Sequence, residues 1–168
     1  PKGHGGASDL KIYKISVEGG EDKLITQNFK GYIGNMLIGD AREFDDIVQQ
    51  PAFIDNEKNL LFCASYHGGC YLYKVSSEGS EPQRIEEGKH EIAYYSIDKN
   101  KQNMAVLKGD VVSTTELYHY KKVGDKWEVK QITNYNSFIV EETNVSKPEE
   151  INFVNSEGIS LQGWQIGR

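Results

Sequence analysis

Two short motifs in this chain have the composition of a loop that binds an oxyanion. These are His-Gly-Gly triplets beginning at His4 and His67, in which glycines would leave backbone amides open to a developing negative charge. Such donors act only beside a nucleophile, and a serine on a sharp strand-to-helix turn needs the pattern Gly-x-Ser-x-Gly, which the sequence lacks. Both triplets instead precede a strand-like segment. We therefore expect simple turns in which glycine supplies a positive φ angle.

The cysteines and remaining histidines offer few other routes to chemistry. Cys63 and Cys70 flank the second triplet, so a disulfide across a hairpin is conceivable, but two cysteines in 168 residues do not make a secreted scaffold. We expect free, reduced thiols and, with them, a cytoplasmic setting. No base is placed to activate Cys63. His90 and His119 have no partner at metal-ligand spacing, so we expect neither a metal nor a cofactor.

Adjacent acidic residues occur four times and could suggest acid–base catalysis or recognition of a peptide amine. Nothing in the sequence fixes their mutual geometry, and exposed acidic pairs on turns are usually just solvated. We therefore predict no catalytic, cofactor-binding or metal-binding residue in this chain. The pairs are Asp45-Asp46, Glu86-Glu87, Glu141-Glu142 and Glu149-Glu150.

The overall composition argues against two classes of partner. A net charge of −6 and a pI of about 5.3 disfavour nucleic acid and anionic membrane surfaces. No apolar run approaches the roughly 18 residues needed to cross a bilayer, and no signal peptide is visible. The chain begins at Pro1, which leads us to expect a processed product or a fragment. Its 17 glycines, four prolines and ten tyrosines suit many short strands joined by tight turns.

A tyrosine-centred strand, a turn and a strand ending in isoleucine recur three times. The tyrosine-to-isoleucine spacing is 12, 12 and 14 residues in chain order. The unit around the second and third copies repeats at 43 to 45 residues and holds about four short strands, which is typical of a β-propeller blade. A β-sandwich remains the alternative. The copies are Tyr13 with Ile25, Tyr73 with Ile85, and Tyr118 with Ile132.

The first two copies are separated by an excess of chain. Tyr13 and Tyr73 are 60 residues apart, about 15 more than one period, and we place the excess between Asn35 and Gln50. The segment from Asp40 has a capping box and apolar residues on one helical face. We predict a helix of one or two turns there.

The copies are too few to close a ring. The sequence predicts an all-β fold, a partial β-propeller of about three four-stranded blades. The strand that should pair with the segment from Leu10 to Ile15 is not found before it, and an unpaired edge is a template for another chain. We expect possible self-association through this edge.

The repeat stops after Thr133. Residues 134–142 are a connector with room for one helical turn, and residues 148–166 are a hairpin with a turn at 155–158. We therefore divide the chain into an incomplete propeller at 1–143 and a linker with a first hairpin at 144–168.

This C-terminal passage resembles the prolyl oligopeptidase family of serine peptidases, most of all its acylaminoacyl-peptidase-like branch. The resemblance is specific from about Val111 to Ile166 and looser from Leu10 to Val106. The family usually continues through an apolar residue and a proline, whereas this chain ends in Gly167-Arg168. The matching residues are S-T-T-E-L-Y at 113–118, I-T at 132–133 with Asn136, S-K-P-E-E-I at 146–151, and E-G at 157–158 with G-W at 163–164.

The resemblance implies a role without catalysis by this chain alone. In that family the propeller caps an α/β-hydrolase domain and admits only small peptides, and the hydrolase domain would lie beyond Arg168. Its partners would be that domain and small peptides, and the parent protein would be a serine-type peptidase in the cytoplasm. The alternative is a free-standing propeller-like scaffold that binds protein or carbohydrate, the latter through exposed tyrosines.

Overall fold

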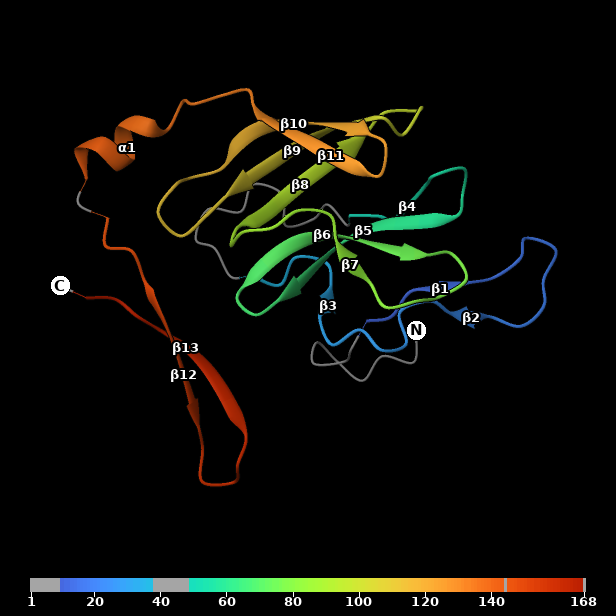
Figure 1. Cartoon of the computed structure of the whole chain (residues 1–168), viewed down its shortest axis with the longest axis horizontal. Helices are drawn as coiled ribbons and strands as arrows, with labels where there is room; N and C mark the ends of the chain where they lie inside the picture. The colour runs from blue at the N-terminus through green and yellow to red at the C-terminus, as the bar shows by residue number, and fades with distance from the viewer. Residues whose placement is uncertain (1–9, 38–48, 144, 168) are drawn as a thin grey trace.

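The computed structural model describes residues 10–37, 49–143 and 145–167, which form thirteen strands and one short helix (Figure 1). Among these residues, no helix is both long and apolar enough to cross a membrane. In chain order the elements are β1 (Tyr13–Lys14), β2 (Lys23–Leu24), β3 (Tyr32–Ile33), β4 (Ala52–Ile54), β5 (Asn59–Tyr66), β6 (Gly69–Ser76), β7 (Gln83–Arg84), β8 (Glu91–Ile97), β9 (Asn103–Gly109), β10 (Glu116–Val123), β11 (Lys126–Gln131), α1 (Ser137–Glu142), β12 (Glu149–Val154) and β13 (Ser160–Gln165).

The three tyrosine-to-isoleucine copies form three antiparallel pairs with one common register. These pairs are β1–β2, β6–β7 and β10–β11. In each, the amide of the closing isoleucine donates to the carbonyl of the residue before the tyrosine, at 2.9, 3.1 and 2.8 Å in chain order. The repeat read from the sequence is therefore a repeat in the structure. The tyrosines face the residue before the isoleucine: Tyr13 with Leu24, Tyr73 with Arg84, and Tyr118 with Gln131.

Two of the copies belong to complete antiparallel meanders of four strands. The middle meander is β4–β5–β6–β7, and the last meander is β8–β9–β10–β11. The two are joined by one parallel pair, Cys70 with Glu91, which makes the combined sheet mixed. Among the residues that the structure describes, no sheet closes on itself. The first copy contributes the two strands β1 and β2, here called the first hairpin, as a sheet of their own.

The excess of chain interrupts the first strand of the middle meander. Both β3 and β4 pair with the same strand, β5, β3 near its end and β4 near its beginning. The matching strand β8 is continuous and has only a register shift between Ile92 and Tyr94, where Ala93 bulges out. The insertion thus lies where predicted, between Asn35 and Gln50. The predicted helix from Asp40 lies outside the described residues.

Two apolar clusters hold these strands together, one on each face of the middle meander. Strands β5 and β6 are buried on both faces because the first hairpin covers one and the last meander covers the other. Full burial of a large apolar side chain stabilises a fold by about 1.5–3 kcal/mol. The cluster toward the last meander is Ile54, Leu61, Cys63, Cys70, Leu72, Ile92, Tyr95, Met104, Val106 and Tyr120; the other is Ile25, Leu60, Phe62, Ala64, Tyr71, Tyr73 and Val75.

The chain ends in a helical turn and a separate two-stranded sheet, as the sequence predicts. Helix α1 has no buried residue, and β12 and β13, the C-terminal hairpin, pair only with each other in the part of the chain described. The hairpin contacts the body at two points. Trp164 lies against Gly68 in the β5–β6 turn, and Glu150 pairs with Lys89. The domain boundary at 143/144 stays a prediction.

Candidate functional site

The second His-Gly-Gly triplet is a two-residue hairpin turn, as predicted. His67 and Gly68 have φ angles of 47° and 71° between Tyr66 and Gly69, which pair with each other. Positive φ at both central positions is the requirement of a type I′ turn, which suits the twist of the flanking strands. The triplet at His4 lies outside the described residues.

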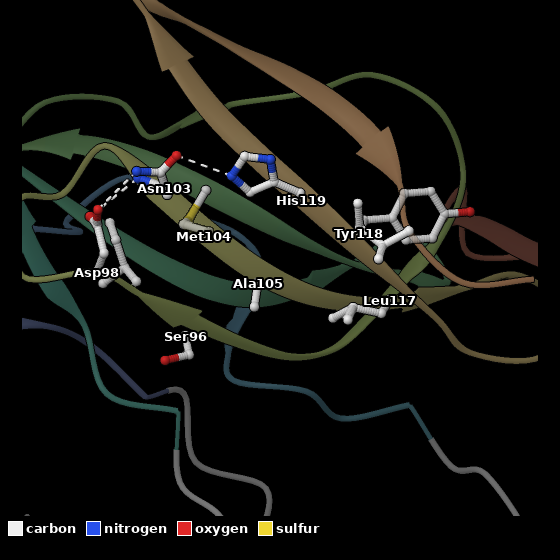
Figure 2. A pocket seen from close by; sticks show the side chains of 10 residues that line it. Ser96, Asp98, Asn103, Met104, Ala105, Leu117, Tyr118 and His119 are labelled. Carbon is white, nitrogen blue, oxygen red and sulfur yellow. Dashed lines mark hydrogen bonds between the residues drawn. The ribbon is translucent and has the colours of Figure 1, made fainter.

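An open hollow of about 370 Å³ lies on the outer face of the last meander (Figure 2). It is lined by residues of β8, β9 and β10, by Asp98 directly after β8 and by Ile132 directly after β11. The described residues that line it are Ser96, Ile97, Asp98, Asn103, Met104, Ala105, Leu117, Tyr118, His119 and Ile132.

A hydrogen-bonded row of polar side chains crosses this hollow. His119 Nε2 lies 3.0 Å from Asn103 Oδ1, and Asn103 Nδ2 donates to Asp98 Oδ2 at 2.9 Å. The bonds from the Asn103 side chain and the Gln102 amide lower the pKa of Asp98. An asparagine amide neither gains nor loses a proton at ordinary pH, so the row cannot relay one. Figure 2 shows the Ser96 hydroxyl apart from this row, so no serine–histidine pair forms.

The aspartate–asparagine pair in this row is a structural feature of the repeat. In the middle meander Asn59 Nδ2 donates to Asp55 Oδ2 at 2.8 Å, in the same turn between the first and second strands. Because both meanders use the pair to close this turn, its role in the hollow is to hold the turn. We assign no chemistry to Asp98 on this ground.

The hollow occupies a place that is filled in the middle meander. Leu61, Leu72 and Ile85 lie on the matching face there and pack under the last meander. One repeat later the same positions are Ala105, Leu117 and Ile132, which line the hollow, and Ile132 is 52% exposed. The hollow is therefore an uncovered packing face.

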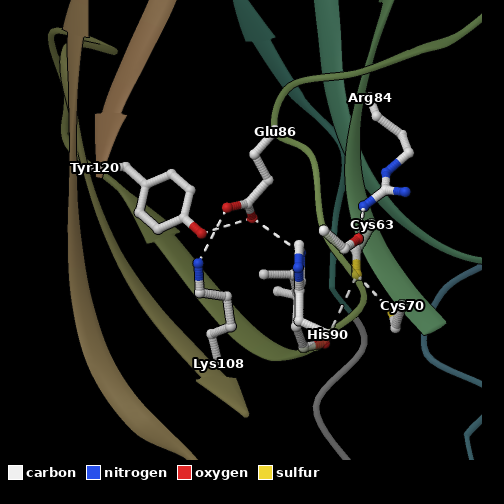
Figure 3. Close-up of polar contacts among 9 residues, drawn as sticks. Cys63, Cys70, Arg84, Glu86, His90, Lys108 and Tyr120 are labelled. Carbon is white, nitrogen blue, oxygen red and sulfur yellow. Dashed lines mark hydrogen bonds and ion pairs between the residues drawn. The ribbon is translucent and has the colours of Figure 1, made fainter. Parts of the chain in front are cut away.

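A buried cluster of charged and polar side chains joins the connection between β7 and β8 to the last meander (Figure 3). Glu86, in the connection from β7 to β8, accepts from the Tyr120 hydroxyl at 2.6 Å and lies 3.1 Å from Lys108 Nζ. His90 Nε2 lies 3.0 Å from the same carboxylate, but its proton does not point along a hydrogen bond. The Glu86 side chain is 11% exposed. This cluster, Glu86, His90, Lys108 and Tyr120, is called the seam cluster below.

The seam cluster keeps Glu86 ionised in spite of burial. Burial alone would raise the pKa of Glu86, but His90, the Tyr120 hydroxyl and the Lys108 charge together lower it. Burial and the adjacent Glu86 carboxylate raise the pKa of Tyr120, which therefore stays a hydrogen-bond donor. The prediction that Glu86-Glu87 is a solvated pair is wrong for Glu86. Sequence reasoning missed the site because its partners lie 22 and 34 residues away.

The two cysteines lie together in the apolar cluster between the middle meander and the last meander, here called the seam. Cys63 Sγ and Cys70 Sγ are 3.0 Å apart, both are buried, and both are free thiols. The hydrogen bond with Cys70, followed by burial, raises the pKa of Cys63 well above its ordinary value. A thiol held in its protonated form is a poor nucleophile. The pair therefore has none of the features of a catalytic cysteine.

Of the other acidic pairs, Glu149-Glu150 has a structural partner, whereas Glu141-Glu142 is exposed in α1. Lys89, with Gln162 and Asn152, lowers the pKa of the half-buried Glu150 to about 2. Asp45-Asp46 lies outside the described residues. Within the described ranges, no group of three or more histidine, cysteine or acidic side chains could hold a metal ion.

The passage that resembles the peptidase family is anchored by one buried carboxylate. Glu116 accepts from the Asn136 amide at 2.7 Å and from the Thr133 hydroxyl, which itself accepts from the Leu117 amide at 2.9 Å. The bond from Thr133 is the largest of the causes that lower the pKa of Glu116. These contacts turn the chain from β11 toward α1. The residues that carry the resemblance therefore act together at the exit from the last meander.

Comparison with known proteins gives two informative likenesses. No protein-family model matches the chain. The uncharacterized peptidase YuxL of Bacillus subtilis (strain 168) is 29% identical over 157 residues, covering 92% of this chain and 23% of that protein. The solved acylaminoacyl peptidase of Pyrococcus horikoshii matches with a TM-score of 0.50 and 22% identity, covering 92% of this chain and 27% of the other.

Both likenesses extend over most of this chain but over a small part of the larger proteins. The chain spans about a quarter of the length of each relative. The solved structure supports the fold, and the sequence relative is itself named a peptidase. The chain is thus similar in sequence to part of a bacterial peptidase and similar in fold to a segment of an acylaminoacyl peptidase.

Proposed function

We propose that the chain is a non-catalytic propeller segment of a serine-type peptidase and selects small peptides for a hydrolase domain elsewhere in the same protein. The observation that carries the proposal is the common register of the three hairpins, in a chain whose relatives are peptidases. The first hairpin would be the outer half of one blade, and the two meanders would be the next two blades. This makes about three blades, of which two are complete.

The packing of the meanders supports a ring assembly. The middle meander packs against the first hairpin on one face and against the last meander on the other. The hollow over Ala105, Leu117 and Ile132 would be the face that receives a further blade of the parent protein. A closed ring over a catalytic site would admit short peptides and hold back folded proteins by size alone.

The C-terminal hairpin fits the opening of a second domain. Its strands form a sheet separate from the meanders (Figure 1). They carry large apolar side chains that are exposed. Ile151, Phe153 and Leu161 share one face and are 42%, 51% and 38% exposed. A hydrolase domain packed on this face would remove that apolar area from water. We infer that this domain is the main partner of the chain, within a cytoplasmic peptidase.

Two assays test this proposal. Incubated alone with a chromogenic acyl-amino acid ester, the chain should give no turnover above buffer. Turnover that a serine-reactive inhibitor abolishes would contradict the absence of catalysis. The product of the whole reading frame should contain a Gly-x-Ser-x-Gly motif and cleave peptides at rates that fall with their length. Equal cleavage of short peptides and folded proteins would contradict the selecting role.

A further inference from the structure

The two cysteines of the middle meander form a site that the proposed peptidase role does not use. Cys63 is on β5 and Cys70 is on β6, and their sulfur atoms lie 3.0 Å apart at the seam (Figure 3). We propose that Cys63 and Cys70 are a redox-modifiable dithiol, which a peroxide converts into an intramolecular disulfide.

The strand register brings the two side chains together. Cys63 is opposite Leu72 and Cys70 is opposite Ser65, so the cysteines are diagonal neighbours two positions apart on one face. A disulfide bond is about 2.05 Å long, so the sulfurs need to approach by roughly 1 Å. The type I′ turn at His67-Gly68 fixes this register.

The other complete meander has no cysteine at the matching positions. One repeat later, the positions of Cys63 and Cys70 are Leu107 in β9 and Thr115, which is exposed just before β10. Two adjacent thiols add a chemistry that the neighbouring repeat lacks.

The reaction is a two-electron oxidation of the pair. One sulfur, as the thiolate, attacks a peroxide oxygen, which breaks the O–O bond, gives a sulfenic acid and releases one water after proton transfer. The second thiolate then attacks the sulfenic sulfur, forms the S–S bond and expels hydroxide, which takes up a proton as a second water. Two thiols and one hydrogen peroxide thus become one disulfide and two water molecules.

Burial makes this reaction slow in the folded chain. Cys63 and Cys70 are 3% and 0% exposed, and Ile92 O of β8 lies 3.9 Å from Cys63 Sγ. A small peroxide should enter when the seam opens briefly, whereas a bulky disulfide such as oxidised glutathione should not. Because the pKa of Cys63 is raised, the rate should increase with pH.

The test uses mass spectrometry on the whole chain. The folded chain is treated with hydrogen peroxide or with dithiothreitol, then denatured and alkylated with N-ethylmaleimide. We expect two maleimide groups on the reduced chain and none on the oxidised chain. The mass of the oxidised chain should be about two hydrogen atoms below that of the reduced chain before alkylation. Peptide mapping should then recover Cys63 linked to Cys70 in a monomer.

Single-cysteine variants provide the control and a second readout. Cys63→Ser and Cys70→Ser should give no intramolecular link. The midpoint of thermal unfolding should be higher for the oxidised than for the reduced wild type, and the same in both treatments for Cys63→Ser. Two alkylatable thiols remaining after peroxide treatment, cysteines oxidised to sulfinic acid, or a link only between chains would each overturn the proposal.

Discussion

At the scale of single residues, Glu86 has the strongest structural role that the fold reveals. Its carboxylate contacts side chains from β9, from β10 and from its own connection to β8. We predict that Glu86→Gln lowers the free energy of unfolding by about 1–3 kcal/mol, because it removes the partner of the buried Lys108 ammonium. Urea denaturation measures this value.

The neighbouring Glu87 provides a matched control. Its side chain is exposed, so Glu87→Gln should change the free energy of unfolding by less than about 0.5 kcal/mol. The two variants differ from the wild type by the same chemical change at adjacent positions. Equal effects of both would mean that the seam cluster does not hold the β7–β8 connection against the last meander.

The charge of Glu86 also predicts a dependence on pH. Because its pKa is lowered in the folded chain, the carboxylate stabilises the fold above its unfolded pKa and loses this effect as pH falls through the folded value. The gap in unfolding free energy between wild type and Glu86→Gln should therefore be full at pH 6 and shrink as pH falls below about 4. A gap that widens on acidification would contradict this assignment.

At the scale of elements, Gly68 tests how the C-terminal hairpin meets the β5–β6 turn. A Cβ at Gly68 would lie 2.1 Å from Trp164 Cζ2, whereas one at Gly124 would have no atom within 4 Å. Both glycines have positive φ, so alanine at either should destabilise the chain by about 1 kcal/mol. Only Gly68→Ala should change the tryptophan fluorescence of the folded chain. The same spectrum in both variants would show that Trp164 does not rest on this turn.

The first hairpin carries the proposed self-association. Ile15 is 60% exposed beside β1, and Val17 is fully exposed in the turn that follows. We predict that sedimentation velocity detects concentration-dependent association, which Ile15→Lys reduces because a charged edge resists strand pairing. Val17→Lys should leave it unchanged. A wild-type chain that stays monomeric at every concentration would contradict the prediction.

Some elements of the structure could be predicted from the sequence and others could not. The repeat, the insertion and the C-terminal hairpin could be predicted because they follow from local sequence patterns. One such pattern is the spacing of Tyr73 and Ile85, which corresponds to the strand register that all three copies share. The seam cluster could not be predicted, because Glu86 and Tyr120 meet only after two meanders pack together. The short distance between Cys63 and Cys70 could be predicted only if the type of the turn between them was known. A register slip of one residue would place the two side chains on opposite faces of the sheet.

At the scale of the whole molecule, the last meander and the C-terminal hairpin both have uncovered apolar faces. Monomeric proteins seldom leave such areas in contact with water. Both faces have a place in the proposed peptidase: a further blade covers the first and a hydrolase domain covers the second. In the proposed peptidase, the chain would be a connecting segment between a ring and an enzyme.

An experimental structure of the protein encoded by the whole reading frame tests this claim most directly. We predict that another four-stranded blade covers Ala105, Leu117 and Ile132, and that β12 and β13 open a domain with a serine nucleophile. A structure in which this face of the last meander stays in solvent, or in which the hairpin joins no hydrolase domain, would contradict the account.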